Sequence, residues 1–256
     1  MDFYKNSESF KEASGYTIDG VWYPRVTKIV GIKAKPALYR YYGEAANFKA
    51  AQSITKKSAE EGTLVHETVE AFLLGETPEI DLSIKPAVDA FLKFWKSRNI
   101  QALPELIEKR VVSYDHRYAG TIDAIALIDG RIGVLDIKTS QAIYRDYNLQ
   151  TSAYMDALKH TPENPQTRWI LKIDQNQTCT LCGAIRRVKG GREKIRIGKS
   201  GNYGRMRGCS HEWAEVLGDI ELQEFPYWQS DFEAFLAAKK LWEWENDEWL
   251  HKVGYL

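Results

Sequence analysis

The sequence lacks any hydrophobic run long enough to cross a membrane, which takes about 18 residues, and its polar, charged N-terminus shows no signal-peptide pattern. Cysteine is also scarce: three residues in 256 exclude a disulfide scaffold and favour a reducing compartment. Repeats and low-complexity linkers are missing, whereas 44% of the residues are hydrophobic and 12% are aromatic. We therefore expect a soluble, folded protein of the cytoplasm.

A formal net charge of zero conceals an uneven distribution of charge. Residues 24–57 carry eight lysines and arginines against one acidic residue, and residues 179–211 carry nine against one. The rest of the chain holds 18 of the 35 basic residues but 33 of the 35 acidic ones. Two basic segments of this kind are typical of a protein that contacts the phosphates of a nucleic acid. The alternative is two solvated faces without a ligand.

Two β-rich runs, residues 119–128 and 131–139, flank Asp129-Gly130, the dipeptide most typical of a tight hairpin turn. Both runs are too apolar for a free-standing surface hairpin, so we expect them inside a sheet. A two-residue turn pairs Ile128 with Arg131, and this pair fixes the partner of every other residue in the two strands.

In that register Asp123 lies directly opposite Asp136, at a Cβ separation of roughly 4.5–5.5 Å, where like charges repel. Lys138 shares their face of the sheet because strand side chains alternate. Two facing carboxylates are stable when a divalent cation binds between them, and a neighbouring lysine suggests hydrolytic chemistry. The hairpin therefore predicts a metal site, the alternative being ordinary polar residues on a solvated sheet face.

Four short motifs follow one another along the chain: Gly62-x-x-x-His66, Gly120-x-x-Asp123, Asp136-x-Lys138 and Gln150-x-x-x-Tyr154. Together they resemble the RecB-like exonuclease branch of the PD-(D/E)XK nuclease superfamily. One departure is Ile137, which stands where the superfamily often has an acidic residue. That branch commonly has an apolar residue there and uses its backbone carbonyl as a metal ligand.

The resemblance implies a catalytic metal ion held by His66, Asp123, Asp136 and the backbone carbonyl of Ile137. Hard divalent cations prefer oxygen ligands, so Mg²⁺ or Mn²⁺ is expected, and a nitrogen ligand shifts the preference toward Mn²⁺. Such an ion is a Lewis acid and lowers the pKa of bound water, which is the chemistry that phosphodiester hydrolysis requires.

Several other residues could take part in the same site. Glu70, one helical turn beyond His66, and Glu108, on the first expected strand, are further candidate metal ligands. Lys138 would orient or deprotonate the attacking water, or stabilise the developing negative charge. The resemblance implies that Gln150 and Tyr154 contact DNA near the scissile phosphate, the alternative being a place at the edge of the core.

All three cysteines lie in one basic, glycine-rich segment, residues 175–218. Cys179-x-x-Cys182-Gly183 is typical of a zinc knuckle, and Cys209-x-His211 supplies two more ligands for a tetrahedral zinc ion. The alternative is a set of reduced thiols that merely pack. An iron–sulfur cluster is disfavoured because a fourth cysteine is missing. We expect this segment to contact the DNA backbone without base specificity.

These patterns predict an α/β fold with a PD-(D/E)XK nuclease core, a mixed central sheet flanked by helices. The core comprises residues 1–174 and 219–256, with the zinc-ribbon-like insertion between them. The first twenty residues are expected to be poorly ordered or peripheral. Ser230-x-x-Glu233 predicts a capping box at the start of a Trp-rich helix that continues to about residue 250. Helices are expected at 60–74, 85–98 and 147–158, and strands at 106–114, 119–128, 131–139, 167–174 and 219–225.

The expected function is a metal-dependent deoxyribonuclease, most simply an exonuclease of DNA recombination, repair or phage DNA processing, in a bacterium or its phage. DNA is the expected partner, with a recombination or replication protein as a further one. Two alternatives remain open: a structure- or sequence-specific endonuclease on the same core, and a catalytically silent zinc-containing DNA-binding module. Intact Asp123, Asp136 and Lys138 argue against silence.

Overall fold

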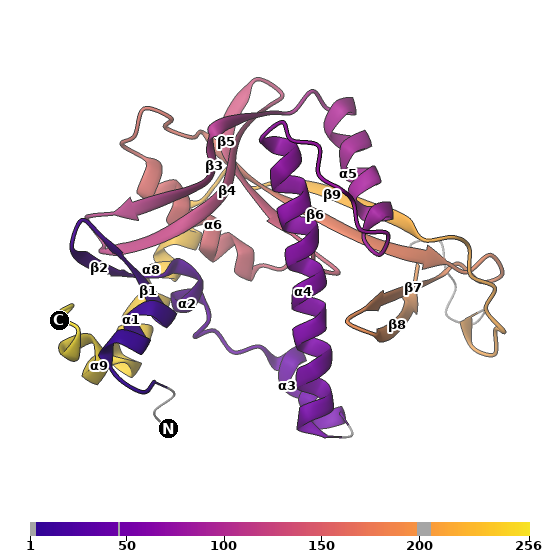
Figure 1. Cartoon of the computed structure of the whole chain (residues 1–256), viewed down its shortest axis with the longest axis horizontal. Helices are drawn as coiled ribbons and strands as arrows, with labels where there is room; N and C mark the ends of the chain where they lie inside the picture. The colour runs from indigo at the N-terminus through magenta and orange to yellow at the C-terminus, as the bar shows by residue number, and fades with distance from the viewer. Residues whose placement is uncertain (1–3, 46, 199–205) are drawn as a thin grey trace.

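The computed structural model describes residues 4–45, 47–198 and 206–256, and its centre is a mixed β-sheet with helices on both faces (Figure 1). In spatial order the strands are β3 (Gln101–Ser113), β4 (Tyr118–Ile128), β5 (Arg131–Lys138), β6 (Thr167–Thr178) and β9 (Leu217–Glu224). Neighbouring strands run antiparallel, except that β5 and β6 are parallel. Helix α6 (Asp146–Leu158) supplies the crossover that a parallel pair requires. The expected α/β class is confirmed.

Two separate hydrophobic clusters cover the two faces of the sheet. One face packs against α1 (Ser7–Ser14), α2 (Val26–Val30), α6, α8 (Gln229–Glu245) and α9 (Asp247–Lys252). The other face packs against α4 (Phe48–Leu73) and α5 (Lys85–Ser97). In the described part of the chain, no helix is long and apolar enough to cross a membrane.

The N-terminal residues are not peripheral, contrary to expectation. After α1, the strands β1 (Gly15–Ile18) and β2 (Val21–Pro24) form a small hairpin of their own. Phe10 is 0% exposed, and its ring lies against those of Trp22, Trp242 and Trp249. Two of these rings, Trp242 and Trp249, come from the other end of the chain, so local polarity gave no sign of this packing.

The C-terminal helix also differs from expectation. Helix α8 begins at Gln229, its N-cap residue is Trp228, and no side chain caps it, so the predicted capping box does not form. Instead Asp231, in the first turn, accepts a hydrogen bond from the buried Arg168 guanidinium. The helix ends at Glu245, and α9 follows after Asn246.

The long helix α4 begins at Phe48 rather than near residue 60, because the Asn47 side chain accepts a hydrogen bond from the Ala50 amide and caps it. The preceding helix α3 (Pro36–Glu44) contains no buried residue. It lies beside the N-terminal end of α4 (Figure 1).

The insertion is shorter than predicted, because β6 continues to Thr178 and β9 begins at Leu217. It contains the hairpin of β7 (Ala184–Lys189) and β8 (Arg192–Ile197), and β7 pairs with the end of β6. Lys199 and Arg205, two of its predicted basic residues, lie outside the described residues.

Replacing Phe10 with alanine tests the role of the N-terminal segment. We expect Phe10→Ala to lower the free energy of unfolding by about 3–5 kcal/mol, because it removes a fully buried aromatic ring. Tyr227→Ala is the matched control, since Tyr227 is 85% exposed and its loss should cost about 0.5 kcal/mol or less. Urea unfolding measures both, and equal midpoints for the two variants would contradict the packing.

Candidate active site and cysteine–histidine cluster

The β4–β5 hairpin has the predicted register, with Ile128 paired to Arg131, but the ladder ends at Ala124 and Leu135. Asp123 and Asp136 therefore do not form a directly opposed pair. The strands separate there, and Asp123 Oδ2 accepts a hydrogen bond of 2.6 Å from the Ile137 amide. The alternation of β4 is also broken: Ile122 and Ile125, three residues apart, pack into the same core cluster.

Asp123 lies within a group of metal-binding side chains from three elements. Its Oδ2 is 3.1 Å from Nε2 of His66 on α4, and Nδ1 of the same histidine is 4.0 Å from Oε1 of Glu108 on β3. His66, Glu70 and Glu108 each place a ligand atom within 4.8 Å of the other two. The structure thus brings together the predicted histidine and both of the additional glutamates.

Asp136 belongs to a second, more deeply buried group. Its carboxylate is 0% exposed, Oδ2 is 2.7 Å from Nζ of Lys138, and Oδ1 accepts a 3.1 Å hydrogen bond from Gln150. The same Gln150 amide donates to the hydroxyl of Tyr154, which is buried. Because Tyr154 is buried and Gln150 lies closer to the surface, the geometry favours Tyr154 as a residue that positions Gln150. The Ile137 side chain packs into the core cluster on the α4 and α5 face of the sheet.

Close contacts explain why glycine stands at the first position of each of the first two motifs, Gly62 and Gly120. A Cβ on Gly120 would lie 2.5 Å from the Tyr154 ring, so only glycine lets that ring pack against β4. A Cβ on Gly62 would lie 2.6 Å from the hydroxyl of Thr139, which follows Lys138 in sequence. Both glycines permit a close approach of helix and strand at the site.

Burial and like charges perturb the ionisation of the acidic groups. Burial, followed by the charges of Asp123 and Glu70, raises the pKa of Glu108 to about 7. Burial, followed by the charge of Asp123, also raises the pKa of Asp136 to about 6, against the opposing effect of Lys138. These raised pKa values show that the protein alone does not fully compensate the negative charge here.

The carboxylates of Asp123, Asp136 and Glu108 also shift the pKa values of the nearby basic groups. Burial lowers the pKa of His66, but its hydrogen bond to Asp123 and the charges of Asp123 and Glu108 outweigh burial and raise it. Burial likewise opposes the charge on Lys138, and Asp136 and Asp123 outweigh it, so that pKa is raised too. For Asp123, His66 and Lys138 overcome burial and lower the pKa. Without a metal ion, Lys138 is therefore a cation at neutral pH.

The residues fit a divalent cation. The buried Asp136 Oδ2 has an ion-pair distance to Lys138, yet no described donor forms a well-directed hydrogen bond with it. Glu108 has a φ of 49°, in the left-handed region that a non-glycine residue rarely adopts, and such strain is often found at functional sites. An oxygen-rich group with one imidazole suits Mg²⁺ or Mn²⁺.

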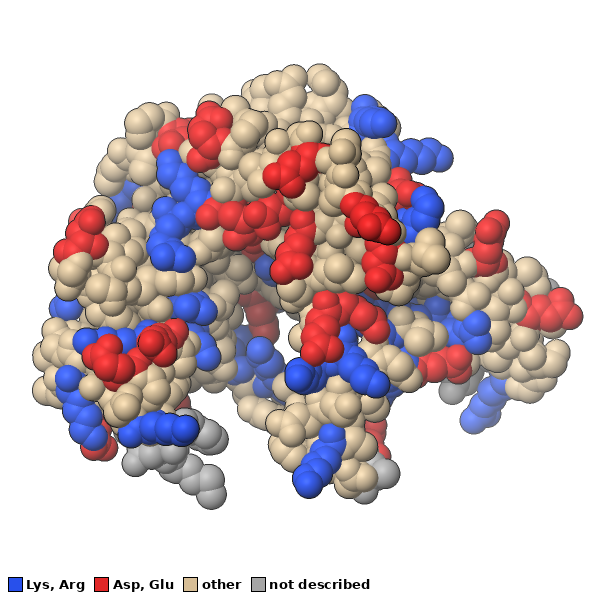
Figure 2. All heavy atoms as spheres, viewed as in Figure 1, with Lys and Arg blue, Asp and Glu red and all other residues tan. Residues whose placement is uncertain are grey.

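All of these groups except the buried Asp136 line a cavity of about 600 Å³ between α4 and the β1–α2 segment. Figure 2 shows the surface hollowed between the lobe that contains α1 and α9 and the lower end of α4. Sequence reasoning missed Arg25, which also lines the cavity and whose Nε is buried without a hydrogen-bond partner among the described residues. Its guanidinium lies 4.4 Å from the ring centre of Tyr16, another lining residue. The single signal in the sequence was its place in a basic segment.

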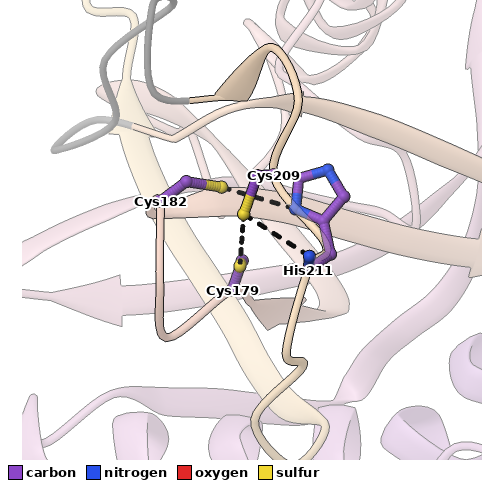
Figure 3. A group of neighbouring side chains, drawn as sticks. All are labelled: Cys179, Cys182, Cys209 and His211. Carbon is purple, nitrogen blue, oxygen red and sulfur yellow. Dashed lines mark hydrogen bonds between the residues drawn. The ribbon is translucent and has the colours of Figure 1, made fainter.

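The four predicted zinc ligands meet in the insertion (Figure 3). Cys179 Sγ lies 3.9 Å from Cys209 Sγ, and Cys182 Sγ lies 3.4 Å from His211 Nδ1. Metal bonds of about 2.3 Å to sulfur and 2.1 Å to nitrogen would give tetrahedral edges of about 3.8 and 3.6 Å. The donor set and its spacing therefore fit a tetrahedral metal ion.

The surroundings of Cys179 favour its thiolate form, whereas burial raises the pKa of Cys182. Burial raises the pKa of the Cys179 thiol, but hydrogen bonds from His211 and from the Cys182 and Leu181 amides lower it to about 6. The imidazole of His211 stacks on Trp213 at a centroid distance of 4.8 Å, which fixes its orientation. Metal ligation requires deprotonated cysteine, so this geometry prepares the cluster for a metal ion.

Comparisons with known proteins add no assignment. No protein-family model matches the chain, and no curated protein matches it. Among solved structures, one similar chain is described as "Crystal structure of SSO0001", with 18% sequence identity and a TM-score of 0.29. The match covers 59% of this chain and 61% of that one, less than two thirds of its length.

Removing the charge of Asp136 tests the balance of charge at this site. A carboxyl with a raised folded pKa binds its proton more tightly in the fold, so its contribution to stability falls as the pH rises from about 4 to about 6. Because burial makes the charge of Asp136 unfavourable in the fold, we expect Asp136→Asn to stabilise the metal-free protein at pH 7.5 by on the order of 1 kcal/mol.

Thermal unfolding in EDTA and in Mn²⁺ measures this effect. Mn²⁺ should raise the Tm of the wild type and leave that of Asp136→Asn nearly unchanged. Asp89→Asn on the exposed surface of α5 is the control and should respond to Mn²⁺ as the wild type does. Destabilisation of Asp136→Asn in EDTA would contradict the inferred repulsion.

Proposed function

We propose that this chain is a metal-dependent deoxyribonuclease of the RecB-like PD-(D/E)XK type. The observation that carries the proposal is the convergence of His66, Asp123 and Lys138 on one cavity where β4 and β5 separate, with the buried Asp136 paired to Lys138 at 2.7 Å. These residues come from sequence motifs of that branch, and a cluster of strongly perturbed ionisable groups in a cavity is typical of a functional site.

The residues divide the chemistry among themselves. His66, Asp123, Asp136 and the Ile137 carbonyl would hold Mg²⁺ or Mn²⁺, with Glu70 and Glu108 as further ligands. A bound ion of this kind supplies Lewis acidity and lowers the pKa of bound water. Lys138 is held by Asp136 at 2.7 Å and carries positive charge, which favours charge stabilisation or orientation of water over proton abstraction in the metal-free site. Gln150 orients the Asp136 carboxylate.

The motif resemblance favours an exonuclease over an endonuclease with structural or sequence specificity. The catalytically silent DNA-binding module is disfavoured because Lys138, which lines the cavity, is paired with the buried Asp136. Linear DNA labelled at its 5′ or 3′ end, single- or double-stranded, and a covalently closed circle separate the two enzymes. An exonuclease degrades the linear DNA in Mn²⁺, leaves the circle intact and is inactive in EDTA.

Substitution of the catalytic pair tests the assignment. We expect Asp136→Ala and Lys138→Ala to lower the cleavage rate by a factor on the order of 10²–10⁴. DNA binding in EDTA should remain within about threefold of the wild type, because phosphate contacts elsewhere supply most of the affinity. Asp89→Ala and Lys96→Ala on α5 are matched controls. Cleavage at wild-type rate by either active-site variant would refute the catalytic role.

The insertion provides a second part of the proposal, a structural zinc ion held by Cys179, Cys182, Cys209 and His211. Its supporting core is small: among the described residues, Ala184, Met206 and Trp213 pack around the cysteines. A segment that buries so little apolar surface gains stability from a metal ion.

Elemental analysis tests the zinc proposal directly. Protein purified without chelators should contain about one equivalent of zinc, and Cys209→Ser and His211→Ala should each reduce that content strongly. His160→Ala is the control, because His160 is exposed and lies outside the insertion. Zinc-free wild-type protein would remove this part of the proposal and leave the nuclease site untouched.

A further inference from the structure

The β7–β8 hairpin carries an arrangement of charge that its own fold does not explain. Its register places Lys189 opposite Arg192 and Arg187 opposite Lys194. Because side chains alternate along each strand, all four cations share one face of the hairpin. Like charges that lie directly opposite each other destabilise a strand pair, and here two such pairs are neighbours on one face of the hairpin.

The two cations of β7 are satisfied within the protein. Arg187 Nε lies 2.5 Å from Asp174 Oδ2, and Arg187 Nη2 donates a 3.3 Å hydrogen bond to the Thr139 carbonyl. Lys189 Nζ donates to the same carbonyl. Burial, followed by the charge of Arg187, nevertheless lowers the pKa of Lys189 to about 8. Thr139 follows Lys138, so the hairpin is joined directly to the proposed active site.

The two cations of β8, Arg192 and Lys194, are on the same face and are exposed to solvent. Within the described ranges, no carboxylate forms an ion pair with either one. Arg192 lies over the ring of Tyr41 on α3, with its guanidinium 4.1 Å from the ring centre. This stacking holds one of the two cations in place while leaving its N–H groups free to bind an anion.

A pocket lies between this face of the hairpin and helices α3 and α4. It is lined by Arg187, Lys189, Arg192 and Lys194 on one side and by Tyr41 and Ser58 on the other. Ser58 also lines the cavity of the active site, so the two pockets adjoin. The Gly190 amide fastens the hairpin turn to α4 through a 2.9 Å hydrogen bond to Glu61.

Further aromatic rings lie on α3, which carries Tyr41, and at the start of α4. Tyr39 and Phe48 are each 63% exposed, and Tyr42 stacks between Tyr41 and Phe48 at centroid distances of 5.5 and 5.3 Å. Aromatic side chains interleaved with cations bind single-stranded nucleic acid, because unpaired bases stack on the rings while the backbone meets the positive charge.

We propose that the hairpin face and α3 form a second phosphate-binding subsite, which holds a single DNA strand as it enters the active site. The inference rests on the proposed nuclease function for its substrate class. Arg192 and Lys194 bind phosphates outside the scissile one, and Tyr41 positions Arg192. Because Arg187 and Lys189 bind the Thr139 carbonyl next to Lys138, the hairpin holds the DNA strand in line with the active site. Its role is therefore to position the DNA as well as to add affinity.

The double variant Arg192→Ala/Lys194→Ala tests the subsite. Its affinity for fluorescein-labelled (dT)20, measured by anisotropy in EDTA, should fall on the order of tenfold, and the salt slope should fall by about 1.4. Binding of a 20-base-pair blunt duplex should change less than about twofold. With Mn²⁺, cleavage of (dT)20 should slow while cleavage of thymidine 5′-(p-nitrophenyl phosphate), which has no flanking phosphates, keeps its wild-type rate.

Lys93→Ala/Lys96→Ala on α5 is the matched control, because it removes the same charge from an exposed surface elsewhere. Wild-type binding of (dT)20 by the hairpin variant, or an equal loss in the control or with the duplex, would overturn the subsite. Absence of cleavage by the wild type would instead refute the nuclease function, and the binding measurements in EDTA would still decide the subsite.

Discussion

The structure depends on the burial of carboxylates where the β4–β5 ladder ends. An isolated hairpin could not keep Asp123 and Asp136 so close, because their mutual repulsion would be added to the cost of removing both from water. The surrounding fold supplies the compensation. Helix α4 brings His66 to Asp123, helix α6 brings Gln150 to Asp136, and the Ile137 amide binds Asp123. The remaining imbalance is what a divalent cation would relieve.

A second buried charge, on Arg168, stabilises the elements that position these carboxylates. The Arg168 side chain, on β6, is 0% exposed and donates to the carbonyls of Asn148, Phe225 and Tyr227 as well as to Asp231. It thereby ties α6, which carries Gln150, to the start of α8. Loss of one partner of a buried ion pair typically costs about 3–5 kcal/mol, so the site is sensitive to a residue that never reaches it.

Features set by short-range patterns could be predicted from the sequence. The Asp-Gly turn fixed the strand register, and motif spacing located the residues that meet in the cavity and in the cysteine–histidine cluster. Predictions failed where distant segments decide the outcome. The ring of Phe10 is buried by residues from the C-terminus, and Arg168 engages the first turn of α8. The prediction that Asp123 lies directly opposite Asp136 was wrong for a related reason. Ideal strand geometry does not anticipate that the buried Asp123 carboxylate accepts a hydrogen bond from the Ile137 backbone amide.

The position of the cysteine–histidine cluster within the chain affects the edge of the sheet. Cys179 directly follows β6, and His211 shortly precedes β9, so the cluster joins the two ends of the loop between a pair of antiparallel strands. Closing such a loop has an entropic cost that a metal ion can offset, much as a disulfide does, and it needs no oxidising compartment. If the loop opens, β9 loses the closure that holds it against β6. The unpaired edge of β6 would then be a template for another chain, so a metal ion bound by these four residues would also limit aggregation.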